Sequence, residues 1–225
     1  MPPDGETSLT LSRSIPVPGP RGGELELPAD LVVPRHTVGC VAFAHGSGSG
    51  RLSPRNRQVA GVLNDAGLAT LLLDLLTPAE AGERRNVFDV ELLAVRLAAA
   101  GSWLEGQPET LGRPLGYFGA STGAAAALRA AAGACPHVGA VVSRGGRPDL
   151  AGPWLPAVRS PTLLIVGALD EDVLTLNRDA LAQLRCEAEL TVVPGATHLF
   201  EQPGTLEQVA ALARDWFLRH LEGPR

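Results

Sequence analysis

From residue 38 onward, short apolar runs alternate with stretches whose apolar residues recur at helical spacing. Continuous apolar runs of this length are typical of strands that are buried on both faces of a sheet. We expect strands at 38–44, 68–73, 115–118, 138–143, 161–166 and 190–193, and helices at 54–66, 86–104, 122–132, 174–185 and 206–221. The alternation predicts an α/β fold, with a mostly parallel central sheet flanked by helices on both faces.

Two further strands are expected near the N-terminus, at about 8–15 and 23–33, with a Pro- and Gly-rich turn between them. The sheet would then contain about eight strands. A length of 225 residues is typical of one domain of ordinary size. We therefore predict a single domain over residues 1–225, in which 1–22 form a strand-and-turn region that is partly flexible.

The charged residues exclude several classes of function. All 19 basic residues are arginine, so the chain offers neither the lysine of a catalytic Schiff base nor the lysine of a P-loop. The formal net charge of -5 argues against a nucleic-acid partner, because such proteins normally present a basic face.

The three cysteines, Cys40, Cys135 and Cys186, are far apart and form no C-x-x-C pair. This spacing argues against a disulfide framework and a structural zinc site, and we expect neither a metal nor a cofactor. Residues 1–10 lack the basic start and apolar stretch of a signal peptide, and no apolar run is long enough to span a membrane. The expected location is the cytoplasm, without a membrane partner.

The run Leu115 to Gly123 reads Leu-Gly-Tyr-Phe-Gly-Ala-Ser-Thr-Gly and joins a predicted strand to an alanine-rich helix. A G-x-S-x-G motif in this context places a serine on a sharp turn above the end of a sheet. Because the chain has 26 glycines, a G-x-S-x-G motif could arise by chance. Its position between a predicted strand and a predicted helix favours a catalytic serine. Ser121 is therefore the candidate nucleophile.

A serine nucleophile needs a base, and the chain has five histidines. His36 and His137 precede strands and so belong to the wrong edge of the sheet, whereas His220 lies near the end of the last helix. His45 follows a strand but lies within a glycine-rich loop, where we expect it to organise the loop rather than act as the base. His198 follows the last strand at the edge where ligands bind in such sheets, and it is the candidate base; the alternative is a loop histidine that caps a helix.

The acid that orients the base is expected after a strand between Ser121 and His198. Asp170, Glu171 and Asp172 all follow the strand at 161–166. We predict that Asp170 orients His198 and that Asp172 caps the following helix. Asp149, after the preceding strand, is the alternative orienter.

Acyl transfer also requires hydrogen-bond donors for the developing oxyanion. The backbone N–H of Thr122 is one candidate, and an N–H near Ser47 in the glycine-rich loop 45–50 is the other. In this interpretation His45 organises the loop, and His45 and Gly46 contact the substrate. A phosphate-binding loop is excluded by the missing lysine and the missing G-x-G-x-x-G motif.

The combination resembles the α/β-hydrolases, and most of all the dienelactone-hydrolase-like group of small members without a lid. The resemblance covers about residues 23–221 and rests on the order Ser, Asp, His and on four segments: 45–48, 119–123, Asp170 with its following valine at 173, and His198. It implies a serine hydrolase that cleaves small carboxylic esters through an acyl-enzyme. Ser121 departs from dienelactone hydrolase itself, which has a cysteine at this position, and so favours ordinary esters over dienelactone.

The same triad would serve a thioesterase, a peptidase or an acyltransferase. A catalytically silent member that binds a ligand or partner is the alternative outside the enzymes. Relatives of this type also occur fused to phosphoribosyltransferase-like domains, so a third interpretation is a domain that works beside another enzyme domain or a separate partner protein. The apolar helix expected at 86–104 could pack internally or form a homodimer face.

The segment between the strands at 138–143 and 161–166 is too short for a helical cap, so we expect a shallow site for short acyl chains. Arg144 and the cluster Arg51, Arg55 and Arg57 could hold a carboxylate of the substrate through bidentate contacts. The alternative is that these arginines are surface charges or helix pairs.

Overall fold

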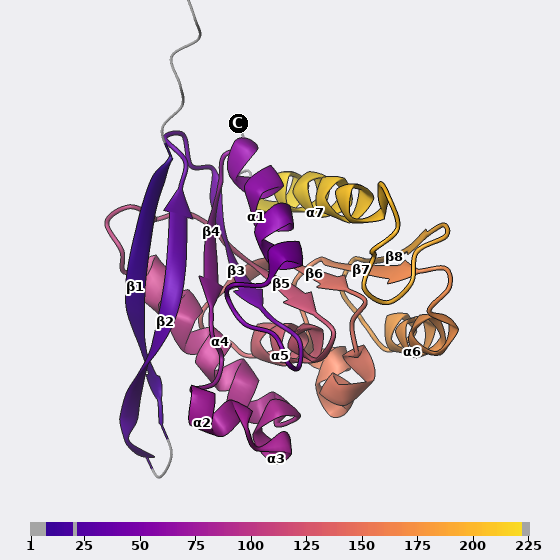
Figure 1. Ribbon diagram of the computed structural model, residues 1–225, viewed down its shortest axis with the longest axis horizontal. Coiled ribbons are helices and arrows are strands. Elements are labelled where there is room, and N and C mark those ends of the chain that lie inside the picture. The colour runs from indigo at the N-terminus through magenta and orange to yellow at the C-terminus, as the bar shows by residue number, and fades with distance from the viewer. Residues whose placement is uncertain (1–7, 20–21, 222–225) are drawn as a thin grey trace, which may run out of the picture.

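The computed structural model describes residues 8–19 and 22–221 (Figure 1). Eight strands form one sheet in the order β1-β2-β4-β3-β5-β6-β7-β8. Their bounds are β1 Leu9–Pro18, β2 Glu24–Val33, β3 Gly39–Ala44, β4 Leu68–Leu73, β5 Leu115–Ala120, β6 Val138–Arg144, β7 Thr162–Gly167 and β8 Ala188–Val193. β2 is antiparallel to β1 and β4, and the remaining neighbours are parallel. The predicted mostly parallel sheet is confirmed.

Helices cover both faces of the sheet. Their bounds are α1 Pro54–Asp65, α2 Pro78–Ala81, α3 Arg84–Val87, α4 Val90–Glu105, α5 Thr122–Ala131, α6 Glu171–Leu181 and α7 Thr205–Leu221, with a 3-10 segment, η2, at Pro148–Ala157. α1 and α7 pack together on one face, while α4, α5 and α6 cover the other (Figure 1). β3, β4, β5 and β7 are buried along their whole length, as their continuous apolar runs predict.

The parallel register brings the carboxyl ends of the central strands to one edge. Ala44 at the end of β3 lies opposite Gly119, and Ala120 at the end of β5 lies opposite Arg144. On the far side, Gly167 of β7 lies opposite Val193 of β8. The loops that follow these strands therefore meet at the edge where ligands bind in open α/β sheets.

The expected helix at 86–104 is divided in two. α3 ends at Val87, and α4 begins at Val90 after the N-cap residue Asp89, whose carboxylate accepts a hydrogen bond of 3.0 Å from Leu92 N. Apolar spacing continues through this break, so periodicity alone does not detect it. α4 packs its apolar side internally, against β1 and α5, and a homodimer stays a prediction.

α2 was missed because four residues are too few to show a helical period. A local signal was present, since Thr77 and Glu80 form a capping box in which the Thr77 hydroxyl accepts from Glu80 N and Glu80 accepts from Thr77 N. Between β6 and β7, the structure has η2 and no large cap.

Within residues 1–22, β1 runs antiparallel to β2. Residues 1–7 and 20–21 lie outside the described part of the chain, and the predicted flexibility there stays a prediction. Among the helices of the described ranges, none has the length and apolarity needed to cross a bilayer.

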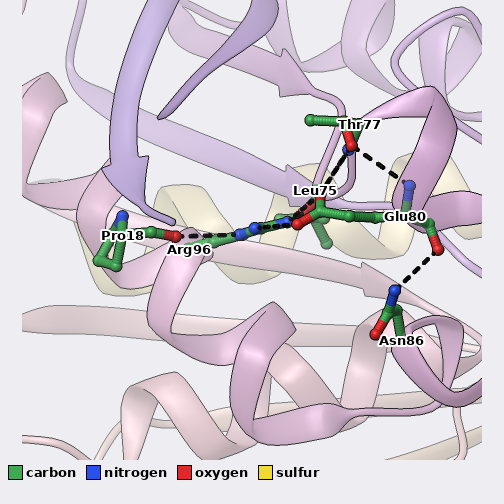
Figure 2. A network of polar contacts seen from close by, with 6 residues as sticks. All are labelled: Pro18, Leu75, Thr77, Glu80, Asn86 and Arg96. Atoms are coloured by element: carbon green, nitrogen blue, oxygen red, sulfur yellow. Dashed lines mark hydrogen bonds and ion pairs between the residues drawn. The ribbon is translucent and has the colours of Figure 1, made fainter. Parts of the chain in front are cut away.

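A buried arginine on α4 ties several segments together (Figure 2). The Arg96 side chain is fully buried and donates to both carboxylate oxygens of Glu80, at 2.7 and 2.9 Å. It also donates to the carbonyls of Leu75 at 2.9 Å and Pro18 at 3.4 Å. The Arg96 hydrogen bonds hold the pKa of the Glu80 carboxyl down at about 2. This contact fixes α2 and the loop after β4 against α4 and the end of β1.

Substitution of Glu80 by Gln should be strongly destabilising, because it leaves the buried Arg96 charge uncompensated. We expect the free energy of unfolding, measured by urea denaturation, to fall by about 3–5 kcal/mol. The matched control is Glu83→Gln, because Glu83 pairs with Arg85 at the surface, where the two side chains are 51% and 81% exposed. The control should lose less than about 1 kcal/mol. Equal losses in both variants would contradict the role of the buried pair.

The same pair predicts a pH dependence. Because the folded pKa of Glu80 lies below its unfolded value of 4.5, its stabilising contribution is present at neutral pH and is lost as pH falls from 4.5 toward about 2. The difference in stability between wild type and Glu80→Gln should therefore shrink in acid.

Candidate active site

Ser121 sits on a strained turn between β5 and α5. Its φ of 52° and ψ of -122° lie in a region that non-glycine residues rarely adopt. Three backbone hydrogen bonds hold the turn: Ser121 N donates to Arg144 O at 3.2 Å, and Ser121 O accepts from Ala124 N and Arg147 N, each at 3.1 Å. Strain of this kind persists only where the surroundings over-determine it, and it concentrates at functional sites.

The glycines of the motif allow the backbones around Ser121 to approach closely. A Cβ on Gly119 would collide with the backbone of Ala124 in α5, and one on Gly123 would collide with the carbonyl of Ala44 at the end of β3. A Cβ on Gly46 would lie 3.0 Å from Ser121 Cβ. Glycine is thus required at positions 119 and 123 for β3, β5 and α5 to meet around Ser121, and a side chain at position 46 would crowd Ser121.

His198 and Asp170 lie in direct contact, with 2.6 Å between His198 Nδ1 and Asp170 Oδ2. A carboxylate can only accept a hydrogen bond, so Nδ1 carries the proton and, in the neutral ring, Nε2 is left as an acceptor. Asp170 occupies the N-cap position of α6, yet its side chain makes no capping bond. The carboxylate faces His198 instead.

The other acids do not contact His198. The prediction that Asp172 caps the helix is wrong: it lies exposed in the first turn of α6, because the helix begins one residue after Asp170. Asp149, the alternative orienter, is engaged by the Arg147 guanidinium through two hydrogen bonds of 2.7 and 2.8 Å.

Ser121 and His198 line the same cavity, of about 200 Å³, which we call the serine pocket. Its lining residues are Gly46, Ser47, Ser49, Ser53, Arg55, Asn56, Ala120, Ser121, Arg144, His198 and Leu199. A second cavity of about 320 Å³, the apolar pocket, shares Gly46, Ser47 and Ser49 of the glycine-rich loop with the serine pocket. It is lined by His45, Gly46, Ser47, Gly48, Ser49, Asp74, Leu76, Ala81, Val87, Leu93 and Thr122.

The two candidate oxyanion donors flank these cavities. Ser47 lines both pockets, and Thr122 is the first residue of α5. A backbone N–H in the first turn of a helix has no acceptor within that helix, so the Thr122 N–H can serve an oxyanion. The chemistry of both residues stays a prediction.

His45 fastens the glycine-rich loop to the loop after β4. Leu75 N donates to His45 Nε2 at 3.0 Å, so Nε2 is unprotonated and Nδ1–H donates to Gly46 O, also at 3.0 Å. At the far end of the loop, Arg51 binds Asp74 through its backbone N at 2.7 Å and its guanidinium at 2.6 Å. These contacts give His45 the organising position that the sequence predicts.

The four candidate arginines separate into two groups. Arg51 is paired with Asp74, and Arg57 lies 3.2 Å from Asp30 at the surface. Arg55 and Arg144 line the serine pocket beside Ser121 and His198. Burial lowers the pKa of the Arg144 guanidinium to about 10, with a contribution from the nearby Arg55 charge.

The wall formed by α2 and α3 was missed at the sequence level. Ala81 and Val87 from these short helices line the apolar pocket together with Leu76 and Leu93. We expected an open site because the segment between β6 and β7 is short. The segment that covers the apolar pocket lies instead between β4 and α4. The capping box formed by Thr77 and Glu80 is the sequence signal that could have predicted α2.

The chain is similar to curated proteins and to solved structures. No protein-family model matches the chain. A curated protein found in two strains of Mycobacterium tuberculosis and named as a proposed phosphoribosyl transferase is 62% identical over 202 residues. The match covers 90% of this chain and 46% of the relative, so the chain spans about half the length of the curated relatives.

Solved structures give a match along the whole length. The crystal structure of dienelactone hydrolase from Anabaena variabilis is 51% identical and superimposes with a TM-score of 0.86, covering 94% of this chain and 99% of that chain. Est1E from Butyrivibrio proteoclasticus is 16% identical with a TM-score of 0.77, covers 94% of this chain and 99% of its own, and shares the fold. The fold and the resemblance inferred from the sequence are confirmed.

The tautomer of His45 can be tested by nitrogen-15 NMR of its imidazole. Burial lowers the pKa of His45 below 6.5, so at neutral pH we expect an uncharged ring with a proton on Nδ1 and none on Nε2. The signal is assigned by its loss in His45→Gln. A ring protonated on both nitrogens at this pH would contradict the assignment.

Because the folded pKa of His45 lies below the unfolded value of 6.5, neutral His45 stabilises the fold above that pH, and this contribution is lost as pH falls below it.

Proposed function

We propose that this chain, which belongs to the dienelactone-hydrolase family of α/β-hydrolases, is a serine hydrolase that cleaves small carboxylic esters. The observation that carries the proposal is the 2.6 Å contact between Asp170 and His198 beside a strained Ser121 in one pocket. A histidine held by an aspartate makes a serine hydroxyl nucleophilic when the free ring nitrogen accepts the hydroxyl proton.

In the proposed mechanism, Ser121 Oγ attacks the ester carbonyl while His198 Nε2 takes its proton. Asp170 accepts from Nδ1–H and stabilises the imidazolium that forms. The tetrahedral intermediate places its oxyanion toward the N–H groups of Thr122 and Ser47. His198 then delivers the proton to the leaving alcohol oxygen, which leaves an acyl-enzyme. Water activated by His198 releases the acid and restores Ser121.

The cysteines give no competing nucleophile at this site. Cys40 is buried in β3, and burial raises the pKa of its thiol to about 12, so the reactive thiolate does not form near neutral pH. Ser121 occupies the elbow, which favours ordinary esters over dienelactone as substrates. Thioesters, amides and acyl acceptors other than water would use the same residues.

The name of the curated relatives concerns a protein about twice as long as this chain. We assign phosphoribosyl transfer, if those proteins perform it, to the part of them that this chain does not match. The residues of the serine pocket support acyl transfer.

Loss of any triad residue should abolish esterase activity. We expect Ser121→Ala, His198→Gln and Asp170→Asn each to lower kcat/KM for p-nitrophenyl acetate and butyrate on the order of 10⁴-fold. Combined substitutions should cost little more than single ones, because the three residues act as a unit. The control Asp172→Asn alters an exposed acid two residues after Asp170 and should retain full activity. If the wild type shows no Ser121-dependent turnover across a broad ester panel, a ligand-binding role replaces this proposal.

The apolar pocket should set the acyl length. Ala81→Leu would fill part of this cavity of about 320 Å³. We expect the ratio of kcat/KM for butyrate to that for acetate to fall by about 10-fold, because discrimination of one or two methylenes in such a pocket has this magnitude. Ala79→Leu, on the same helix but outside the pocket lining, is the control and should keep the wild-type ratio. An unchanged ratio in Ala81→Leu would place the acyl group elsewhere.

A further inference from the structure

Phe200 has a backbone conformation that is rare for a bulky residue. Its φ is 55°, and among the described residues Ser121 is the other non-glycine residue with a positive φ. Phe200 is 2% exposed and lies two residues after His198, in the segment 197–202 that we call the histidine loop. Backbone strain persists where the surroundings over-determine it, often at functional sites. The strain at Phe200 therefore indicates that the histidine loop is held in one required shape.

The side chain of Gln202 closes the histidine loop. Its Oε1 accepts from the backbone N–H of Thr197 at 3.1 Å, and its Nε2 donates to Thr197 Oγ1, also at 3.1 Å. Inside the loop, Phe200 N donates to Thr197 O at 3.2 Å. His198 directly follows Thr197, so these bonds fix the backbone from which the His198 side chain projects.

Both ends of the histidine loop are anchored. The carbonyl of Gln202 accepts from Thr205 N at 3.1 Å and from Thr205 Oγ1 at 2.7 Å, and Thr205 is the first residue of α7. Before the loop, the carbonyl of Ala196 accepts from Leu169 N at 2.9 Å, and Leu169 directly precedes Asp170. The loop is thus tied to α7 on one side and to the segment that carries Asp170 on the other.

His198 needs this support because its side chain is only partly buried. The side chain is 38% exposed and makes a hydrogen bond of 2.6 Å to Asp170. Its backbone is confined from the other side by Gly145, where a Cβ would lie 3.1 Å from the His198 carbonyl oxygen. The backbone of the histidine loop and the bond to Asp170 together set the place of the imidazole in the serine pocket.

We propose that Gln202 is a positioning residue, whose hydrogen bonds to Thr197 hold His198 where it can exchange a proton with Ser121 and the leaving group. This inference rests on the proposed ester hydrolysis and adds a residue outside the triad. Gln202 is absent from the linings of the serine pocket and the apolar pocket, so it acts through His198 and not on the substrate. A displacement of about 1 Å in a reacting group can cost a factor on the order of 10² in rate.

The first test separates kcat from KM. Gln202→Leu keeps a side chain of similar size and removes the hydrogen bonds to Thr197. With p-nitrophenyl acetate we expect kcat to fall by about 10- to 100-fold, because acylation and deacylation both pass a proton through His198. KM should stay within about 2-fold of wild type, because the substrate does not touch Gln202.

Gln202→Glu is the conservative variant that should rescue the rate. At pH 7 its carboxylate can accept from both the N–H and the hydroxyl of Thr197, as Gln202 Oε1 does at 3.1 and 3.3 Å. We expect kcat within about 3-fold of wild type.

Two further variants complete the test. Thr197→Val removes the hydroxyl and leaves the backbone bond to Gln202, so kcat should fall by about 2- to 5-fold; this variant carries the test if Gln202→Leu fails to fold. The double variant should be no slower than Gln202→Leu, because both substitutions remove the same contact. Gln58→Leu is the control, since Gln58 binds Glu207 of α7 at an exposed position, and it should keep the wild-type kcat. Wild-type kcat in both loop variants, or a loss confined to KM, would overturn the role of Gln202.

Proton NMR measures the placement of His198 without a substrate. The Nδ1 proton, held against Asp170 at 2.6 Å, should give a downfield signal that is assigned by its loss in His198→Gln. In Gln202→Leu this signal should broaden or disappear, because a ring that leaves Asp170 part of the time exchanges its proton with water. The signal should persist in Gln202→Glu and Gln58→Leu.

The NMR signal separates failure of this inference from failure of the proposed function. If wild type hydrolyses no ester but the signal depends on Gln202, the positioning role stands and the esterase proposal fails. If esters are hydrolysed and the signal is unchanged in Gln202→Leu, the positioning role fails alone.

Discussion

The close approach of β3, β5 and α5 is the constraint on which the site depends. It is possible because Gly119 and Gly123 have no Cβ to collide with α5 and with the end of β3. The tight junction forces Ser121 into a strained conformation, and backbone hydrogen bonds from β6 and its following loop hold it there. Every other element of the site is arranged around this fixed point at the carboxyl edge of the sheet.

Polar contacts extend this rigidity to the loops. His45 and the Arg51–Asp74 pair fasten the two ends of the glycine-rich loop to the segment after β4. Arg96 and Glu80 in turn fix that segment and α2 against α4 (Figure 2). The wall of the apolar pocket and the candidate oxyanion loop are thus parts of one connected network. Such a network holds the reacting groups and the oxyanion donors in place. Acyl transfer depends on this placement more than on the affinity for the substrate.

The two buried arginines, Arg96 and Arg144, have different partners, one ionic and one neutral. Arg96 meets a carboxylate of its own chain, and its charge strengthens the fold. Arg144 donates a hydrogen bond to the Asn56 side-chain amide oxygen and lines the serine pocket. A buried charge without a counter-ion is unfavourable for stability, whereas a buried pair offsets part of its desolvation cost.

The amino-acid sequence by itself determined the fold class and the strand-turn-helix segment around Ser121, because apolar runs and glycine spacing can be read locally. It also placed His198 at the carboxyl edge of the sheet through the order of the predicted strands, and the role of His198 as the base stays a prediction. Only the tertiary structure showed that the Asp170 carboxylate contacts His198 while Asp172 leaves α6 uncapped, that Arg51 is paired with an acid while Arg144 is not, and that α2 and α3 line a pocket. These outcomes depend on contacts between residues far apart in the chain, such as Arg144 with Asn56, 88 positions away. No local pattern encodes which partner a buried side chain will meet.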